Sequence, residues 1–106
     1  MNIRISEGQL RFRITREDLE KLLGGTALAL ALNLGEQSVS YIVELATSEQ
    51  PLTIEIQPLI WKLVVDKTAL SMLAASLPSR EGIEHEVLLG GTQLKLALEV
   101  DVRRKR

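Results

Sequence analysis

Apolar residues at every second position are the feature that most constrains how this 106-residue chain folds. In residues 26–34, leucines alternate with alanines and one asparagine. Ala and Leu favour helices by intrinsic propensity, but a helix would spread these leucines around its circumference, whereas a strand places them on one side. The period of two therefore predicts a strand. The same alternation predicts strands at 3–5, 10–14, 39–45, 52–57, 59–65, 83–87 and 94–102.

Glycines and a proline predict where some of these strands turn. Glu7-Gly8 and Gly90-Gly91 are expected to form hairpin turns, because glycine accepts positive φ. Pro58 has no N–H to donate, so it predicts an edge position, a bulge or a bend before the strand at 59–65.

Two helices are expected between the strands. Thr15, with an acidic residue three positions later, resembles a capping box, and Gly24-Gly25 ends the helix that follows. Asp66 is a good N-cap for the second helix, which Pro78 stops. Both segments carry leucines at helical spacing, which predicts one buried face for each helix.

The pattern occurs twice along the chain. Residues 10–22 match residues 61–73 at an offset of 51, and the following strands match at an offset of 55. The sequence therefore predicts an α+β domain over residues 1–106, made of duplicated ββαββ units at about 1–47 and 51–102, with a basic tail at 103–106. Because open apolar edges recruit other chains, the eight strands are expected to join into one mostly antiparallel curved sheet or barrel with two helices.

Composition excludes several classes of protein. Apolar residues make up 45% of the chain and charged residues 25%, as in an ordinary globular domain. Without cysteine there is no disulfide, no thiol catalysis and no thiolate metal site. A net charge of −1 argues against a nucleic-acid binder that uses its whole surface. No apolar run reaches the length of a membrane span, and a cytoplasmic location is expected.

No catalytic residue, cofactor or metal site is expected. His85 is the single histidine, and the acidic residues on either side of it point away from it in a strand, so no metal-ligand set converges there. The serines lack a nucleophile elbow, and the glycine doublets fit neither a Walker loop nor a dinucleotide fingerprint.

Basic residues allow two interpretations. Arg4, Arg11 and Arg13 share one face of the first predicted hairpin, where carboxylates on other strands can pair with them in a solvated outer face. Alternatively, these arginines join Lys62 and Lys95 as anion ligands on a basic barrel face. In outline, such a barrel resembles the triphosphate tunnel enzymes, which handle phosphates and nucleotides, although this chain lacks their early E-x-E-x-K motif.

The end of the chain is its densest cluster of charge. A polybasic segment of this kind can make weak contacts with nucleic acid or with an anionic membrane surface, or it can act simply as a solubilising tail. The residues concerned are Arg103, Arg104, Lys105 and Arg106.

The first strands carry a family resemblance. Ile3-Arg4-Ile5 followed by residues 10–15, Leu-Arg-Phe-Arg-Ile-Thr, is similar to a set of small uncharacterised bacterial proteins that open with I-R-I and L-R-x-R-L-T strands. The resemblance covers about the first 45 residues and, more loosely, residues 82–102. Those relatives carry E-K-D-F and a cysteine where this chain has Glu99-Val100-Asp101-Val102, so any thiol role in them would be absent here.

The leading functional hypothesis is a non-enzymatic binding or oligomerisation module of the bacterial cytoplasm, acting as a homodimer or with a protein partner. It rests on the missing catalytic constellation and on the many aliphatic strand faces. The alternative is a small phosphate- or nucleotide-handling enzyme that uses the five basic residues named above.

Overall fold

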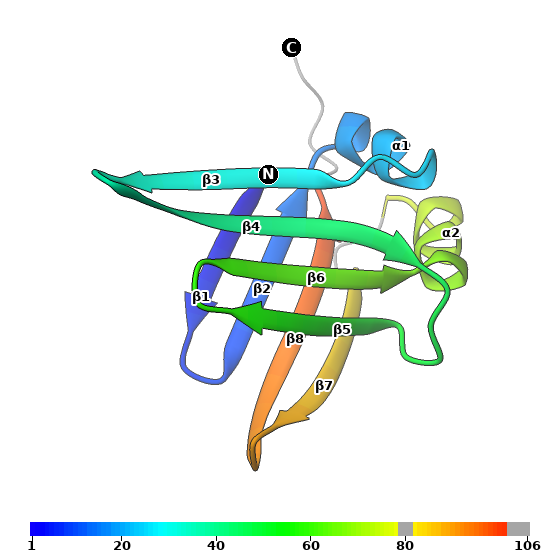
Figure 1. The fold of residues 1–106 in the computed structure, drawn as a ribbon. Coiled ribbons are helices and arrows are strands. Elements are labelled where there is room, and N and C mark those ends of the chain that lie inside the picture. Colours follow the sequence, from blue (N-terminus) through cyan, green and yellow to red (C-terminus); the bar gives the residue numbers. More distant parts are fainter. Residues whose placement is uncertain (79–81, 102–106) are drawn as a thin grey trace.

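The computed structural model describes residues 1–78 and 82–101, which form eight strands and two helices (Figure 1). In chain order the elements are β1 (Asn2–Ser6), β2 (Gln9–Ile14), α1 (Arg16–Leu23), β3 (Leu28–Leu34), β4 (Gln37–Ala46), β5 (Leu52–Gln57), β6 (Ile60–Asp66), α2 (Lys67–Ala75), β7 (Ile83–Leu89) and β8 (Thr92–Val100).

The strands form two separate four-stranded sheets, with orders β1-β2-β8-β7 and β3-β4-β6-β5. The predicted single eight-stranded sheet or closed barrel is therefore wrong, while the α+β class is correct. Each sheet consists of two antiparallel hairpins joined by a central parallel pair, β2 with β8 and β4 with β6. Figure 1 shows the strands of one sheet running across those of the other. The core lies between these two layers.

The parallel pairs could not be deduced from alternation. A period of two says which face a side chain occupies, but it carries no information on the direction of a neighbouring strand. Hairpin partners are antiparallel because a short turn joins them, whereas β2 and β8 are far apart in sequence and meet only through the tertiary fold.

The two sheets have equivalent strand orders. By position in the two halves of the chain, β1 corresponds to β5, β2 to β6, β3 to β7 and β4 to β8. Exchanging each strand for its counterpart turns the order β1-β2-β8-β7 into β5-β6-β4-β3, which is the order of the other sheet read in reverse. Each sheet therefore holds one hairpin from each half of the chain. The two sequence halves are interleaved rather than stacked as separate layers.

Both helices begin at the residues expected to cap them. Thr15 Oγ1 accepts the Asp18 backbone N–H at 3.0 Å, and Asp18 Oδ2 accepts the Thr15 N–H at 3.2 Å, which completes the capping box. Gly24 forms the C-cap of α1. Asp66 caps α2, whose C-cap is Ser76. The two helices contact each other and lie together at one end of the sheets (Figure 1).

The turns also agree with the sequence. Gly90 and Gly91 have φ values of 56° and 85°, and they connect β7 to β8. Positive φ at both central residues belongs to the type I′ turn, whose twist suits a hairpin. Pro58 lies between β5 and β6 and so takes no part in the sheet ladder.

The inner faces of both sheets are mostly apolar, and no polar or charged residue is buried in the described part of the chain. Tyr41 and Trp61 pack against this core with their rings edge to face at a centroid distance of 5.8 Å. The fully buried side chains are Phe12, Ile14, Leu22, Leu52, Leu63, Leu70, Leu96, Leu98, Val43 and Val65.

The strand predicted at 26–34, β3, lies mostly outside the core. Leu28 is buried, but Leu30, Leu32 and Leu34 are exposed, although all four share one face of β3. The β3–β4 hairpin extends past the layer beneath it, as its free tip in Figure 1 shows. Alternation therefore identified the strand and its two faces. Which of its leucines are buried depends instead on the extent of the sheet packed against it.

Candidate functional site

The outer face of the sheet β1-β2-β8-β7 collects the arginines of the first hairpin. Alternation in β1 and β2 directs Ile3, Leu10 and Phe12 inward, so the arginines between them point outward. The hairpin register places Arg4 directly opposite Arg11, and Asn2 opposite Arg13. The parallel pairing with β8 then brings Glu99 beside Arg13.

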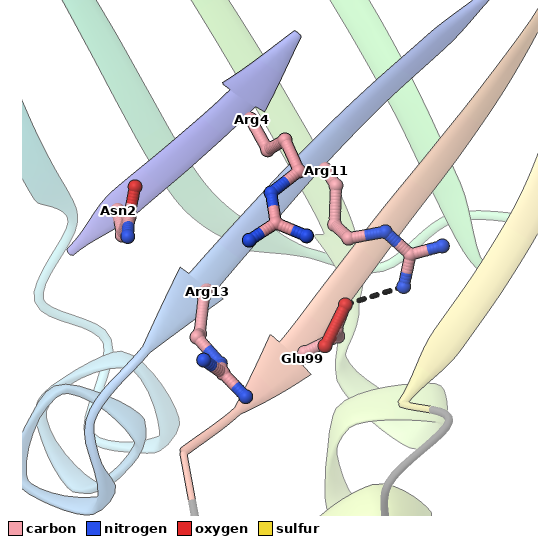
Figure 2. A pocket seen from close by; sticks show the side chains of 5 residues that line it. All are labelled: Asn2, Arg4, Arg11, Arg13 and Glu99. Atoms are coloured by element: carbon pink, nitrogen blue, oxygen red, sulfur yellow. Dashed lines mark hydrogen bonds and ion pairs between the residues drawn. The ribbon is translucent and has the colours of Figure 1, made fainter. Parts of the chain in front are cut away.

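These five side chains line a pocket of about 150 Å³, which we call the arginine pocket (Figure 2). Figure 2 shows all of them on the same side of the sheet, with the guanidinium groups gathered around the Glu99 carboxylate. The lining residues are Asn2, Arg4, Arg11, Arg13 and Glu99. The expectation that Arg4, Arg11 and Arg13 share one face is thus correct.

Arg11 is held in place by carboxylates from the neighbouring strands. Its Nη1 donates to Glu99 Oε1, and its Nη2 lies 3.3 Å from Glu84 Oε2 on β7. The hydrogen bond to Glu99 is the main reason that the pKa of Arg11 is raised above its ordinary value, and the negative charges of both carboxylates add to it. Arg11 is therefore a fixed, permanently charged wall of the pocket.

Arg4 and Arg13 make no ion pair with any residue in 1–78 or 82–101. Both are exposed, and the pocket they line with Arg11 contains a single carboxylate against three guanidiniums. Like charges on opposite residues of neighbouring strands repel each other, so Arg4 raises the local positive potential facing Arg11. The pocket is an electropositive hollow with unused N–H donors.

The two predicted lysines do not join this pocket. Lys95 lies on the same sheet, with its Nζ 3.6 Å from Glu84 Oε2, a carboxylate that Arg11 also contacts, but Lys95 does not line the pocket. Lys62 lies on the other sheet, where its Nζ is 3.2 Å from Glu44 Oε2 and 4.0 Å from Glu55 Oε2. The hydrogen bond with Glu44 is the main reason that the pKa of Lys62 is raised.

The expectation that Lys62 joins the arginines requires one continuous sheet. The chain forms two sheets with opposite outward faces instead, and so the five residues cannot converge. Two lining residues were missed. Asn2 could have been found by extending the Glu7-Gly8 hairpin register, because it lies opposite Arg13. Glu99 could not, because its place depends on the parallel pairing of β2 with β8.

The other candidates of the sequence lie elsewhere. His85 is half-buried on the inner face of β7, opposite Leu96, with Glu84 and Glu86 exposed on the outer face. Among the described residues, no three His, Asp or Glu side chains gather as a metal-binding group.

Neither helix of the described chain is long and apolar enough to cross a membrane. Residues 103–106 lie outside the described residues.

The chemistry available in the arginine pocket is that of binding. Guanidinium groups stay protonated at any physiological pH and present N–H donors in a planar fork that matches carboxylate and phosphate oxygens. The asparagine adds an amide that donates or accepts. The one carboxylate is occupied by Arg11. An anion with several oxygens is the ligand that complements such a set.

Comparison with known proteins adds a family without adding an activity. No curated protein and no solved structure is significantly similar to this chain. A family model matches residues 1–103, which includes both sheets, both helices and all the residues of the arginine pocket. The chain therefore belongs to DUF7009, a family of unknown function.

Proposed function

We propose that this protein is a non-enzymatic binding module that holds a phosphate-type oxyanion in the arginine pocket. The observation that carries this proposal is the direct opposition of Arg4 and Arg11 across a strand pair, with Arg13 beside them and one carboxylate among them. Such an arrangement repels itself when empty, and a bound anion neutralises it.

The size and openness of the pocket indicate the class of ligand. A volume of about 150 Å³ corresponds to roughly five water molecules at about 30 Å³ each. This is room for the phosphoryl part of a ligand rather than for the whole of a larger one. Because Arg4 and Arg13 are exposed, the remainder of a larger ligand would extend into solvent. We therefore expect the terminal phosphate or the polyphosphate part of a ligand to occupy the pocket.

The open position of the pocket favours binding over the alternative of a triphosphate-tunnel enzyme. A tunnel requires basic side chains that point into an enclosed barrel. Here the arginines lie on an outer face, and the buried residues between the sheets, among those described, are all apolar. An open pocket leaves water free to compete, which suits recognition better than the exclusion of water that phosphoryl-transfer sites use.

Isothermal titration calorimetry with phosphate, pyrophosphate and tripolyphosphate tests the proposal at low salt. We expect affinity to rise with the number of phosphoryl groups. Arg4→Gln and Arg13→Gln should each weaken tripolyphosphate binding about tenfold, the loss of one charge-assisted contact of ~1.5 kcal/mol. The matched control is Lys62→Gln, which removes the same charge from the other sheet and should leave affinity unchanged.

Two results would count against the pocket. One is the absence of heat with all three anions. The other is an equal loss of affinity in Lys62→Gln and Arg4→Gln, which would mean that the anions respond to overall charge rather than to this site.

We also infer that the two halves of the chain derive from one duplicated ββαββ unit. The matching strand orders of the two sheets and the spacing of the sequence repeat support this. A chain made of two copies of residues 1–50 would then fold into the same pair of sheets. If that chain formed no β structure by circular dichroism, the inference would fail.

A further inference from the structure

Strand β3 is an edge strand with one free side. It pairs only with β4, and residues 29–34 are exposed on both of its faces. The backbone N–H and C=O groups on its free side therefore have no strand partner within the described residues. A free edge of this kind is a template for another strand.

The other three edge strands carry charges that discourage such pairing. β1 holds Arg4, β5 holds Glu55, and β7 holds Glu84 and Glu86. β3, with the sequence Leu-Ala-Leu-Ala-Leu-Asn-Leu, holds none. Charged side chains on an edge are a common protection against strand addition. Among the described strands, β3 alone is an edge without this protection.

The exposed face of β3 is also apolar. Leu30, Leu32 and Leu34 are 38%, 51% and 57% exposed. Leu30 lies beside Tyr41 on β4, and Tyr41 lies beside Trp61 on β6, so the leucines of β3 are continuous with these two aromatic residues. The exposed leucines therefore extend the hydrophobic core sideways, past the edge of the sheet that lies under it. Contiguous apolar surface of this kind commonly marks an interface.

We propose that β3 pairs with β3 of a second copy of this chain, antiparallel about a twofold axis at Ala31. The strand reads almost the same in both directions, so this register places Leu30 opposite Leu32 and Leu28 opposite Leu34. Directly opposite residues of an antiparallel pair project to the same face, so leucines meet leucines and alanines meet alanine or asparagine. The two four-stranded sheets become one continuous sheet of the dimer.

The near-palindrome is the reason to choose a second copy over a foreign strand. A twofold interface requires the same surface on both partners, and a strand whose pattern is its own reverse meets that requirement. The absence of charge in β3 adds a second reason, since its copy brings no charge against the leucines. The proposal is independent of the arginine pocket, which lies on the other sheet.

Because the chain contains no cysteine, single cysteines can measure the register directly. In the proposed dimer, two copies of Ala31→Cys place their Cα atoms about 4.5–5.5 Å apart, within the range of a disulfide. Two copies of Asn33→Cys lie four residues out of register, about 13 Å apart, which is too far. With oxidised glutathione, we expect Ala31→Cys to give a covalent dimer on a non-reducing gel and Asn33→Cys to remain mostly monomeric.

Light scattering after size-exclusion chromatography measures the association itself. We expect a dimer at micromolar concentration, and Ala31→Lys should weaken it at least tenfold because two lysines would face each other at the axis. Ala31 is exposed, so this substitution does not disturb the core. The matched control is Gln57→Lys, an exposed residue at the end of another edge strand, which should leave the dimer intact.

Three results would overturn the proposal. The unmodified chain could remain monomeric at concentrations up to about 100 μM. Ala31→Lys could leave a dimer unchanged, which would place the interface elsewhere. Asn33→Cys could cross-link as efficiently as Ala31→Cys, which would exclude the register about Ala31.

Discussion

Each sheet has one basic residue at an equivalent position on its outer face, but the neighbours of that residue differ between the two sheets. Arg11 on β2 and Lys62 on β6 are equivalent in the strand orders, and each bonds to a glutamate on the central strand next to it, Glu99 or Glu44. On the outer strand, however, Lys62 faces Glu55, whereas Arg11 faces Arg4. Arg11 also bonds to Glu84 on the far edge strand β7, so its own charge is paired, and the unpaired charge at this sheet is that of Arg4.

The difference teaches how two sheets with equivalent strand orders can carry different charges on their outer faces. A lysine between two carboxylates has its charge satisfied within the protein. Arg11 is also paired with two carboxylates, Glu99 and Glu84, but Arg4 opposite it makes no ion pair among the described residues, so positive charge remains at this edge. If the proposed function is correct, the second arrangement contributes less to stability and more to recognition, which is the usual direction of the compromise between the two.

The two sheets should contribute equally to the stability of the core, although their outer faces differ. Leu63 and Leu98 are fully buried, each in the central parallel pair of its sheet. We expect Leu63→Ala and Leu98→Ala each to lower the free energy of unfolding by about 3 kcal/mol, because each leaves a cavity in the shared core. Urea denaturation followed by circular dichroism measures both. A loss below about 1 kcal/mol in only one of them would contradict the equal contribution of the two sheets.

The two helix caps provide a second comparison. Thr15 caps α1 within a local capping box. Asp66 caps α2 through the Ala69 N–H at 3.1 Å and also accepts the Ser48 N–H at 3.0 Å, which ties the segment between β4 and β5 to the helix. Those two hydrogen bonds from backbone N–H groups lower the pKa of Asp66, and the one from Ser48 has the larger effect. Ionised Asp66 therefore stabilises the folded chain.

The sign of this effect gives a pH prediction. Because the pKa is lower in the folded state, the stabilisation is fully present above the unfolded pKa, near 4, and is lost as the pH falls through the folded value. We expect Asp66→Asn to melt at a lower temperature than the unmodified chain at pH 7, and the difference to shrink steadily as the pH falls below about 4. Calorimetry across pH 2.5–7 measures the difference, with Glu20→Gln on α1 as the control. A difference that stayed constant down to pH 2.5 would exclude the role of the charge.

Charge reversal at the equivalent edge positions should have the smallest effect on stability. Arg4→Glu gives Arg11 the kind of neighbour that Lys62 has, and Glu55→Arg does the opposite to Lys62. After screening by solvent, we expect Arg4→Glu to stabilise the chain by a few tenths of a kcal/mol. Glu55→Arg should lower the urea midpoint. Arg4→Glu should also abolish tripolyphosphate binding.

Salt provides the control for this pair. Both stability differences should shrink as NaCl is raised from 0.02 to 1 M, because exposed charges are screened beyond a few ångströms at high ionic strength. Destabilisation by Arg4→Glu, or a difference that salt does not change, would mean that the residue acts through packing rather than through its charge.

Most of the local structure could be predicted from the residues themselves. The alternation in residues 26–34 outweighed the helix propensity of Ala and Leu, and residues 28–34 of this segment form strand β3. Thr15 and Asp66 begin helices, and Gly90-Gly91 turns a hairpin, because cap and turn geometry depend on a few adjacent residues. The shared face of Arg4, Arg11 and Arg13 follows from the same short-range rules.

What the residues alone determined is therefore which side chains share a face, where helices begin and where hairpins turn, since these depend on contacts between near neighbours. Only the tertiary structure decided that β2 lies parallel to β8, that Glu99 reaches Arg11, that Lys62 stands on the opposite layer, and that β3 extends beyond its cover. The physical reason is that pairing between distant strands depends on how whole hairpins pack, and the period of a single strand carries no record of its partner's direction or length.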